Sequence, residues 1–143
     1  MSDIAKEALR HGVLFQDIGD DALDGILEIG HEVSFGAGEA IFHAGDAPDG
    51  MYVVLEGEAQ VDVGGRFHRL KPGDFFGEMG LLTSDKRMAT VRSVEPVRAL
   101  RIDADTFQRY LHDHPQVAVS MLQAVVHRLR EVEQRIDAWM GSS

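Results

Sequence analysis

The stretch MYVVLEGEAQVDVGGRFHRLKPG, residues 51–73, decides the fold class of this chain. It contains three short apolar or alternating runs, MYVVLEG, AQVDV and FHRL, with turn-forming residues at VGG and KPG. Short runs with a period of two, bounded by turn residues, are typical of β-strands. Gly57 and Gly73 suit turns that need a positive φ or a close approach of the backbone. The stretch therefore predicts consecutive short strands joined by tight turns.

The same pattern continues on both sides of this stretch. Further short runs are EVSF, AIFH, FFGE, ATVRS and VRALRI, and further turns are GAG and AGDAPDG, which contains Gly45. Roughly eight strands at this spacing, without helices between them, indicate an antiparallel sandwich or jelly roll. We therefore expect a mainly β fold with flanking helices (α+β), in which residues 31–102 form an eight-stranded antiparallel jelly-roll barrel.

Two short N-terminal helices are expected before the strands, within residues 1–30. They cover residues 3–11 and 20–30, and in the second one apolar residues recur at spacings of three and four. This spacing places them on one side of a helix. Asp20 or Asp21 can cap the second helix, because a short carboxylate side chain accepts a hydrogen bond from the first backbone N–H groups.

C-terminal helices are expected over residues 103–140. Asp103 and Asp105 can cap a first helix, and the pair His114-Pro115 predicts a break followed by a new helix start. One long helix then runs to about residue 140. Apolar residues recur along it at alternating steps of three and four, which is the a/d seam of a heptad pattern. The seam consists of Leu122, Val125, Leu129, Val132, Ile136 and Trp139.

Length and composition fit one globular domain over residues 1–143. Hydrophobic residues make up 44% of the chain and charged residues 27%, with a formal net charge of −10. The chain has no cysteine, which excludes a disulfide framework, a thiolate nucleophile and a cysteine metal site. Neither a signal peptide nor an apolar run of about 20 residues is present, so we expect no membrane insertion and a cytoplasmic location.

The acidic balance argues against direct binding of nucleic acid. A DNA-binding protein usually presents a basic patch that displaces counterions from the phosphates. The one mild cluster of basic residues, Arg128, Arg130 and Arg135, alternates with Glu131 and Glu133. We interpret this cluster as a solvated helix face.

An enzymatic function is not expected. A jelly roll is also the fold of cupin metal enzymes, which need an H-x-H arrangement with a Glu and a further His. The close pair His112 and His114 lies at a predicted helix end rather than on a strand, so no metal site is predicted. No Ser-His-Asp order and no pair of carboxylates in a plausible cleft is evident. No cofactor is expected.

Two charged residues stand out in the apolar stretch FFGEMGLLTSDKRMATVRS, residues 75–93. Gly77 and Gly80 permit an external group to approach the backbone, and the free N–H groups of a helix start favour an anion. The fork of Arg87 could bind a phosphate through two donors, and Glu78, which only accepts, suits a sugar hydroxyl. These residues fit a ligand with hydroxyl groups and about one negative charge. The alternative is a structural ion pair between Glu78 and Arg87.

The segment FGEMGLLTSDKRMATVR, residues 76–92, resembles the phosphate-binding cassette of cyclic nucleotide-binding domains. The pattern of that cassette is Phe-Gly-Glu, an apolar run, a loop, and then Arg followed closely by Ala. The segments FGAGEAIFHAGDAPDGMYVVLEGEAQV and RLKPGDFFGE are similar to the early strands and turns of this family, which includes catabolite activator protein and the regulatory subunit of protein kinase A. The resemblance covers about residues 13–135 and implies a cyclic nucleotide ligand.

The resemblance also implies roles for individual residues. In the family the Glu at this position binds the ribose 2′-hydroxyl and the Arg binds the cyclic phosphate, which gives those roles to Glu78 and Arg87. Members that favour cyclic GMP often carry Thr or Ser directly after the Arg. Met88 stands there in this chain and has no donor, so cyclic AMP is favoured. The implied ligand-binding set is Phe76, Gly77, Glu78, Met79, Gly80, Leu81, Arg87, Met88 and Ala89.

Contacts to the base are expected from the C-terminal helix, because a residue of that helix often caps the base in this family. Apolar side chains could cover the purine, and Arg side chains could stack on it through their guanidinium planes. Two valines of a predicted strand, or Phe67, could also touch the purine, with core packing as the alternative. The candidates are Val61, Val63, Arg128, Leu129, Val132 and Arg135.

The chain is therefore expected to be a cyclic nucleotide sensor, either as a stand-alone protein or as a regulatory module. Only 36 residues follow Phe107, which leaves no room for a DNA-binding domain. Ligand binding is expected to move the long helix about a hinge near His114-Pro115, and its seam could pair with a second copy or pack on its own barrel. The alternative function is an interaction or dimerisation module without nucleotide. The sequence does not name an effector protein.

Overall fold

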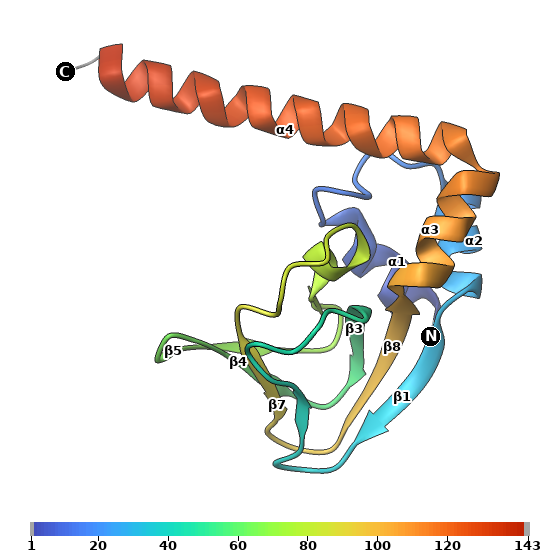
Figure 1. Ribbon diagram of the computed structural model, residues 1–143, viewed down its shortest axis with the longest axis vertical. Helices are drawn as coiled ribbons and strands as arrows, with labels where there is room; N and C mark the ends of the chain where they lie inside the picture. Colours follow the sequence, from blue (N-terminus) through green and yellow to red (C-terminus); the bar gives the residue numbers. More distant parts are fainter. Residues whose placement is uncertain (1, 142–143) are drawn as a thin grey trace.

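Eight strands form the centre of the structure, a computed structural model that describes residues 2–141 (Figure 1). The predicted domain range of 1–143 also includes residues 1, 142 and 143, which lie outside the described residues. All eight predicted strands are confirmed. They are β1 (His31–Phe35), β2 (Ala40–Phe42), β3 (Gly50–Glu56), β4 (Ala59–Val63), β5 (Arg66–Leu70), β6 (Phe75–Phe76), β7 (Thr90–Ser93) and β8 (Val97–Asp103).

The strands form two four-stranded antiparallel sheets with the orders β1-β8-β3-β6 and β2-β7-β4-β5. This arrangement confirms the predicted jelly roll, but the two sheets do not close into a barrel. Strands β4 and β5 are joined by a two-residue turn with φ of 58° at Gly64 and 86° at Gly65. Positive φ at both central residues is the type I′ turn that suits the twist of a tight hairpin.

Strand β3 is buried on both faces and separates two cores. Met51, Val53 and Leu55 point toward the helices, where they join the larger apolar cluster. The alternate residues Tyr52 and Val54 point toward the second sheet and join the smaller cluster between the sheets. Successive side chains of a strand lie on opposite faces, so a strand covered on both sides reads as a continuous apolar run. This explains the sequence MYVVL.

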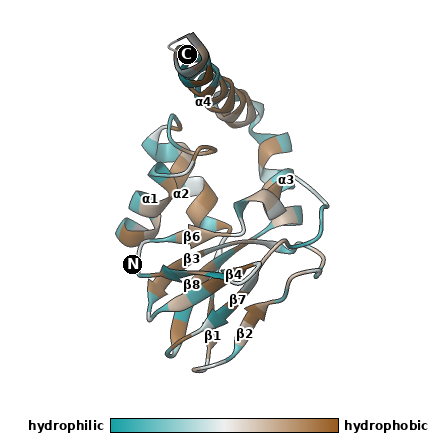
Figure 2. Ribbon diagram, turned by 90° about the vertical axis from the view of Figure 1, so that its left-hand side faces the viewer, coloured by the Kyte–Doolittle hydropathy of each residue, from teal (hydrophilic) through white to brown (hydrophobic). Residues whose placement is uncertain are grey.

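The helices cover one side of the sandwich, as Figures 1 and 2 show. Their bounds are α1 (Ser2–Arg10), α2 (Asp20–Glu28), α3 (Ala104–Asp113) and α4 (Pro115–Gly141), with a short 3₁₀ helix η1 (Glu78–Leu81) after β6. The predicted helices are confirmed, including the break at His114, with bounds within about three residues of those expected. Among residues 2–141, no helix has both the length and the apolarity needed to span a membrane.

The predicted helix caps are wrong in detail. Gly19 occupies the N-cap of α2, and Asp20 and Asp21 lie in the first turn instead. Asp103 occupies the N-cap of α3 but its side chain makes no capping hydrogen bond, and Asp105 lies in the first turn. Carboxylates in a first turn still interact favourably with the positive end of the helix dipole.

Among the described residues, the buried side chains of helix α4 all lie in its first turns. Val117, Met121 and Ala124 are buried there. Farther along, the helix extends away from the sandwich (Figure 1). Leu122 and Leu129 of the heptad seam are 63% and 57% exposed. The alternative in which the seam packs on its own sandwich is therefore wrong for this structure, because a different stripe makes those contacts.

Candidate functional site

A cleft of about 280 Å³ lies between η1, the segment that follows it, and strands β2, β4 and β7. This volume is close to the lower end of the range of about 300–1,000 Å³ that is typical of small-molecule sites. The lining residues are Phe42, Pro48, Val61, Phe76, Gly77, Glu78, Met79, Gly80, Thr83, Asp85, Lys86, Arg87, Met88, Ala89 and Val91. A larger groove of about 630 Å³ between α2 and the start of α4 contains none of the predicted ligand-binding residues.

Arg87 is buried at one wall of the cleft, with 8% of its surface exposed. Its Nη2 donates to Asp49 Oδ1 at 2.7 Å and to the Gly50 carbonyl at 2.6 Å, and its Nη1 donates to the Gly77 carbonyl at 3.1 Å. The guanidinium carbon lies 4.1 Å from the centre of the Phe42 ring, which is a cation–π contact. The protein itself therefore fixes the position of this guanidinium.

Two glycines make room for the Arg87 guanidinium. A Cβ at Gly77, where φ is +75°, would lie 2.7 Å from Arg87 Nη1, and a Cβ at Gly80 would lie 2.9 Å from the same atom. These distances are too short for a carbon beside nitrogen. The group that approaches these glycines in this structure is Arg87, and the approach of an external group to them stays a prediction.

Glu78 has a buried oxygen without a partner. No ion pair joins Glu78 to Arg87 among the described residues, so the structural ion pair considered from the sequence is wrong. Glu78 Oε2 is buried and accepts no hydrogen bond, and Arg87 Nε is likewise buried without an acceptor. Burial raises the pKa of the Glu78 carboxyl above its ordinary value, because removing a carboxylate from water disfavours its charged form. Both atoms belong to residues that line the cleft.

The structure brings most of the predicted ligand-binding residues together. Leu81 is an exception: it is fully buried in the core beside the helices, and its carbonyl accepts a hydrogen bond from Gln108 Nε2 at 3.1 Å. Val63, a base-contact candidate on β4, also lies outside the lining and is exposed at the tip of the β4–β5 hairpin. The predicted residues that do line the cleft are Val61, Phe76, Gly77, Glu78, Met79, Gly80, Arg87, Met88 and Ala89.

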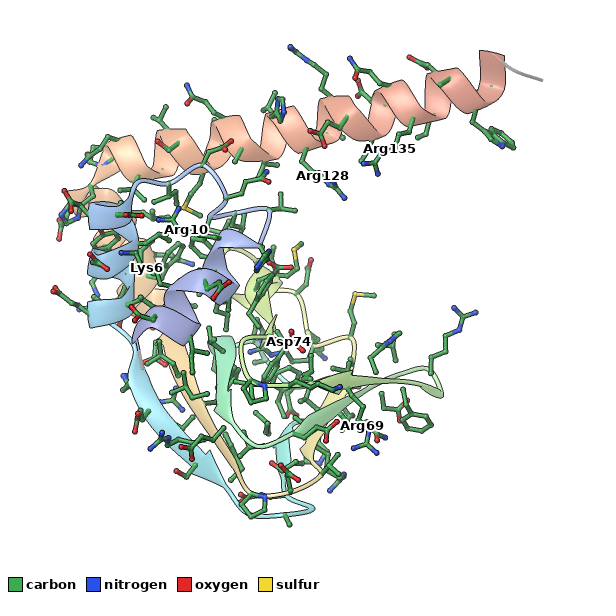
Figure 3. All side chains as sticks on the ribbon, turned by 180° about the vertical axis from the view of Figure 1, so that it is seen from behind. Lys6, Arg10, Arg69, Asp74, Arg128 and Arg135 are labelled. Carbon is green, nitrogen blue, oxygen red and sulfur yellow. The ribbon has the colours of Figure 1, made fainter. Side chains whose placement is uncertain are left out.

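The four base-contact candidates of α4 do not line the cleft. Arg128 and Arg135 project from the part of α4 that has left the sandwich (Figure 3). Leu129 and Val132 are exposed on the same part. The physical reason is that only the first turns of α4 are held by packing, so the contacts expected from this helix require another position of the helix or a second chain.

Sequence reasoning missed several residues of the cleft. Phe42 and Pro48 come from segments far from residues 75–93, and only the fold brings them together. Asp49 could have been found, because a buried guanidinium such as that of Arg87 requires an anionic or carbonyl partner. The turn AGDAPDG contains Asp49, whose carboxylate is that partner in the structure. The remaining lining residues that were not predicted are Thr83, Asp85, Lys86 and Val91.

An antiparallel jelly roll with a small cleft, a buried arginine and a buried carboxylate oxygen without a partner has the features of a ligand-binding domain. Residues 32–114 match the family model of the cyclic nucleotide-binding domain. The chain therefore belongs to the cyclic nucleotide-binding domain family, and the resemblance seen in the sequence is confirmed.

Similar proteins include transcriptional regulators and the regulatory domain of PKA. The chain is 24% identical over 136 residues to the CRP-like cAMP-activated global transcriptional regulator of Mycobacterium tuberculosis, covering 91% of this chain and 61% of the relative. The N-terminal domain of a transcriptional regulator from Streptomyces coelicolor A3(2) superposes with a TM-score of 0.77 at 30% identity, covering 89% of this chain and 95% of that one. The regulatory domain of Toxoplasma gondii PKA, solved with cAMP, superposes with a TM-score of 0.64 at 27% identity, covering 76% of this chain and 43% of that one.

Proposed function

We propose that this domain senses cyclic AMP, which binds in the cleft between η1 and strands β4 and β7. The observation that carries the proposal is the buried oxygen of Glu78 that accepts no hydrogen bond. A carboxylate oxygen in this position is costly unless a donor reaches it, and a ribose 2′-hydroxyl supplies such a donor. The similar Toxoplasma gondii domain was solved with cAMP, which supports the choice of ligand.

The cyclic phosphate is proposed to lie against Arg87. The Nη2 atom already bonds Asp49 and Gly50, so the phosphate would use Nε, which has no acceptor, and would share the guanidinium charge with Asp49. One guanidinium balances about one negative charge, which fits a phosphodiester and not a triphosphate. Lys86 is a second cation in the lining, next to the carboxylate of Asp85.

The preference for cyclic AMP over cyclic GMP rests on Met88. This residue directly follows Arg87 in the lining of the cleft and is 88% exposed. Its thioether has no donor for guanine O6 or N7, so it offers a guanine no hydrogen bond that would favour it over adenine. We therefore expect a higher affinity for the adenine nucleotide.

Isothermal titration calorimetry tests the proposal. Cyclic AMP should bind with a Kd near micromolar or tighter, and cyclic GMP should bind more weakly. Arg87→Ala should lower the affinity at least tenfold, because the loss of one partner of a buried charged contact typically costs about 2–5 kcal/mol. Arg92→Ala is the matched control, because Arg92 lies nearby on β7 but its Nη1 donates to the Gly38 carbonyl outside the cleft.

A second titration tests Glu78 by itself. The 2′-deoxy analogue of cyclic AMP should bind the unaltered domain more weakly than cyclic AMP does. Glu78→Ala should bind the two ligands about equally, since the hydroxyl then has no acceptor. If neither nucleotide produces heat at millimolar concentration with the unaltered chain, the domain is the alternative considered from the sequence, an interaction module that retains the fold without nucleotide.

The long helix is proposed to carry the response. Ligand binding would move α4 about the corner at His114, so that base-contact candidates such as Leu129 and Val132 approach the cleft. The exposed seam is also proposed to pair with that of a second copy as a coiled coil. Amide exchange over residues 115–140 with and without cyclic AMP tests the movement, and sedimentation velocity tests the dimer.

An effector protein and a cytoplasmic location remain predictions.

A further inference from the structure

Strand β5 (Arg66–Leu70) leaves one edge of the second sheet open. In the order β2-β7-β4-β5 it is the last strand, and among residues 2–141 it pairs only with β4. Residues 66–69 are all exposed, so no other described element covers this strand. Figure 1 shows the β4–β5 hairpin extending outward from the sandwich. An open edge presents backbone N–H and C=O groups to which another strand can pair.

The turn geometry shows which backbone groups face this open edge. In a two-residue type I′ hairpin, the residues that flank the turn bond to each other, here Val63 and Arg66. Bonded and non-bonded positions alternate along an antiparallel pair. His68 therefore bonds to β4, whereas the N–H and C=O groups of Phe67 and Arg69 point outward. Two outward residues provide the start of a new ladder.

The charge of the hairpin differs from that of the chain. Residues 59–71 contain three basic residues, Arg66, Arg69 and Lys71, and one acidic residue, Asp62, so their formal charge is +2. The chain as a whole carries −10. Arg69 Nη1 is 3.6 Å from Glu58 Oε1, a long contact that leaves half of the Arg69 side chain exposed. Arg69 lies where the hairpin leaves the sandwich (Figure 3).

An apolar side chain lies between these cations. Phe67 is 61% exposed and shares a strand face with Arg69, while Arg66 and His68 share the opposite face. Charged residues on an edge strand usually prevent pairing with other chains. A purely protective edge would not expose a phenylalanine beside an outward N–H group. Pairing of β5 with β5 of a second copy is disfavoured, because it would bring the arginines of both strands together.

We propose that the β5 edge binds an extended acidic segment of a partner protein, which adds to the second sheet as a further antiparallel strand. The segment would place acidic residues opposite Arg66, His68 and Arg69 and an apolar residue opposite Phe67. Backbone hydrogen bonds would supply the register, and the alternating side chains would supply the selectivity, as in other cases of strand addition. This surface is separate from the nucleotide cleft, so the proposal does not depend on the proposed function.

The test uses the full chain and a fluorescein-labelled peptide, Thr-Glu-Glu-Val-Glu-Thr-Glu, with blocked ends. Fluorescence anisotropy at 50 mM salt should show saturable binding, and the peptide with Lys in place of every Glu should not bind. The double variant Arg66→Glu, Arg69→Glu should weaken binding at least tenfold. The control double variant Arg128→Glu, Arg130→Glu, which makes the same charge change on α4, should leave binding unchanged.

Amide exchange followed by NMR distinguishes strand addition from simple charge attraction. The amides of Phe67 and Arg69 should become at least tenfold more protected when the peptide is bound, while the amide of His68 changes little. The proposal is overturned if the peptide does not bind at 1 mM, if both double variants bind alike, or if these two amides gain no protection. Tighter binding of a single-stranded oligonucleotide with the same number of charges would also overturn it in favour of nucleic acid.

Discussion

Replacing Gly77 by alanine tests whether the turn before η1 exists to accommodate Arg87. Gly77 has φ of +75°, and its added Cβ would lie 2.7 Å from Arg87 Nη1. Gly64 is a matched control, because its φ is +58° and no atom lies within 4 Å of its added Cβ. Both alanine variants pay the backbone cost of a left-handed conformation, roughly 1–2 kcal/mol. Only Gly77→Ala also displaces a buried guanidinium.

The extra cost follows from the bonds that the displacement breaks. Moving Arg87 away from the new methyl group weakens its bonds to the carbonyls of Gly50 and Gly77. A hydrogen bond to a charged group contributes about 1.5–3 kcal/mol. If the displacement costs the equivalent of one such bond, Gly77→Ala should lower the free energy of unfolding by about 3–5 kcal/mol, and Gly64→Ala, which has only the backbone cost, by about 1–2 kcal/mol. Urea unfolding measures both.

The same two variants report on ligand binding. Gly77→Ala should lower the affinity for cyclic AMP at least tenfold, because the guanidinium leaves its position at the wall of the cleft. Gly64→Ala should bind with the affinity of the unaltered chain. Equal losses of stability in the two variants, together with equal affinities, would show that Gly77 serves only its backbone conformation and that the Arg87 contact has no role.

Three further predictions follow from other parts of the molecule. Burial raises the pKa of Glu78 in the folded state, so the ionised carboxylate should lower the free energy of unfolding as the pH rises through that pKa. Glutamine has no charge to bury, so urea unfolding from pH 4 to 7 should show the free energy of unfolding of Glu78→Gln rising relative to that of the unaltered chain. Phe107 is fully buried with its ring 6.0 Å from that of Phe15, and Phe107→Ala should cost about 3–5 kcal/mol in the same assay. Leu129→Glu should leave unfolding of the monomer unchanged, because Leu129 is exposed, but should abolish a dimer detected by sedimentation velocity.

The order of strands and helices could be predicted because each signal is local. The alternating run of residues 59–63 and the Gly64-Gly65 turn specify a hairpin without reference to the rest of the chain. The break at His114-Pro115 is local in the same way, since proline restricts the residue before it. Closure of the sheets is not local, because it depends on how strands distant in sequence pair at the edges. The strand spacing was therefore compatible with a sandwich of two open sheets, but the closed barrel that was expected does not form.

The site could be predicted in composition but not in its internal bonding. Glu78 and Arg87 were identified because charges in an apolar stretch need a partner. The sequence does not show that Asp49, 38 residues before Arg87, is the partner of that arginine. The sequence also does not show which face of α4 packs on the sandwich. Both faces carry apolar residues, with Val117 and Met121 on the buried face and Leu122 on the exposed one.

Helix α4 has the geometry of a lever arm. Its 27 residues extend over about 40 Å at 1.5 Å per residue, and its buried side chains lie in its first turns. For a helix of this length, a rotation of about 10° at the corner moves the far end by roughly 7 Å. A small rotation of α4 at His114 would thus move the far end of the helix by more than the rise of one helical turn. A protein that bound the far end would respond to this displacement without contacting the nucleotide.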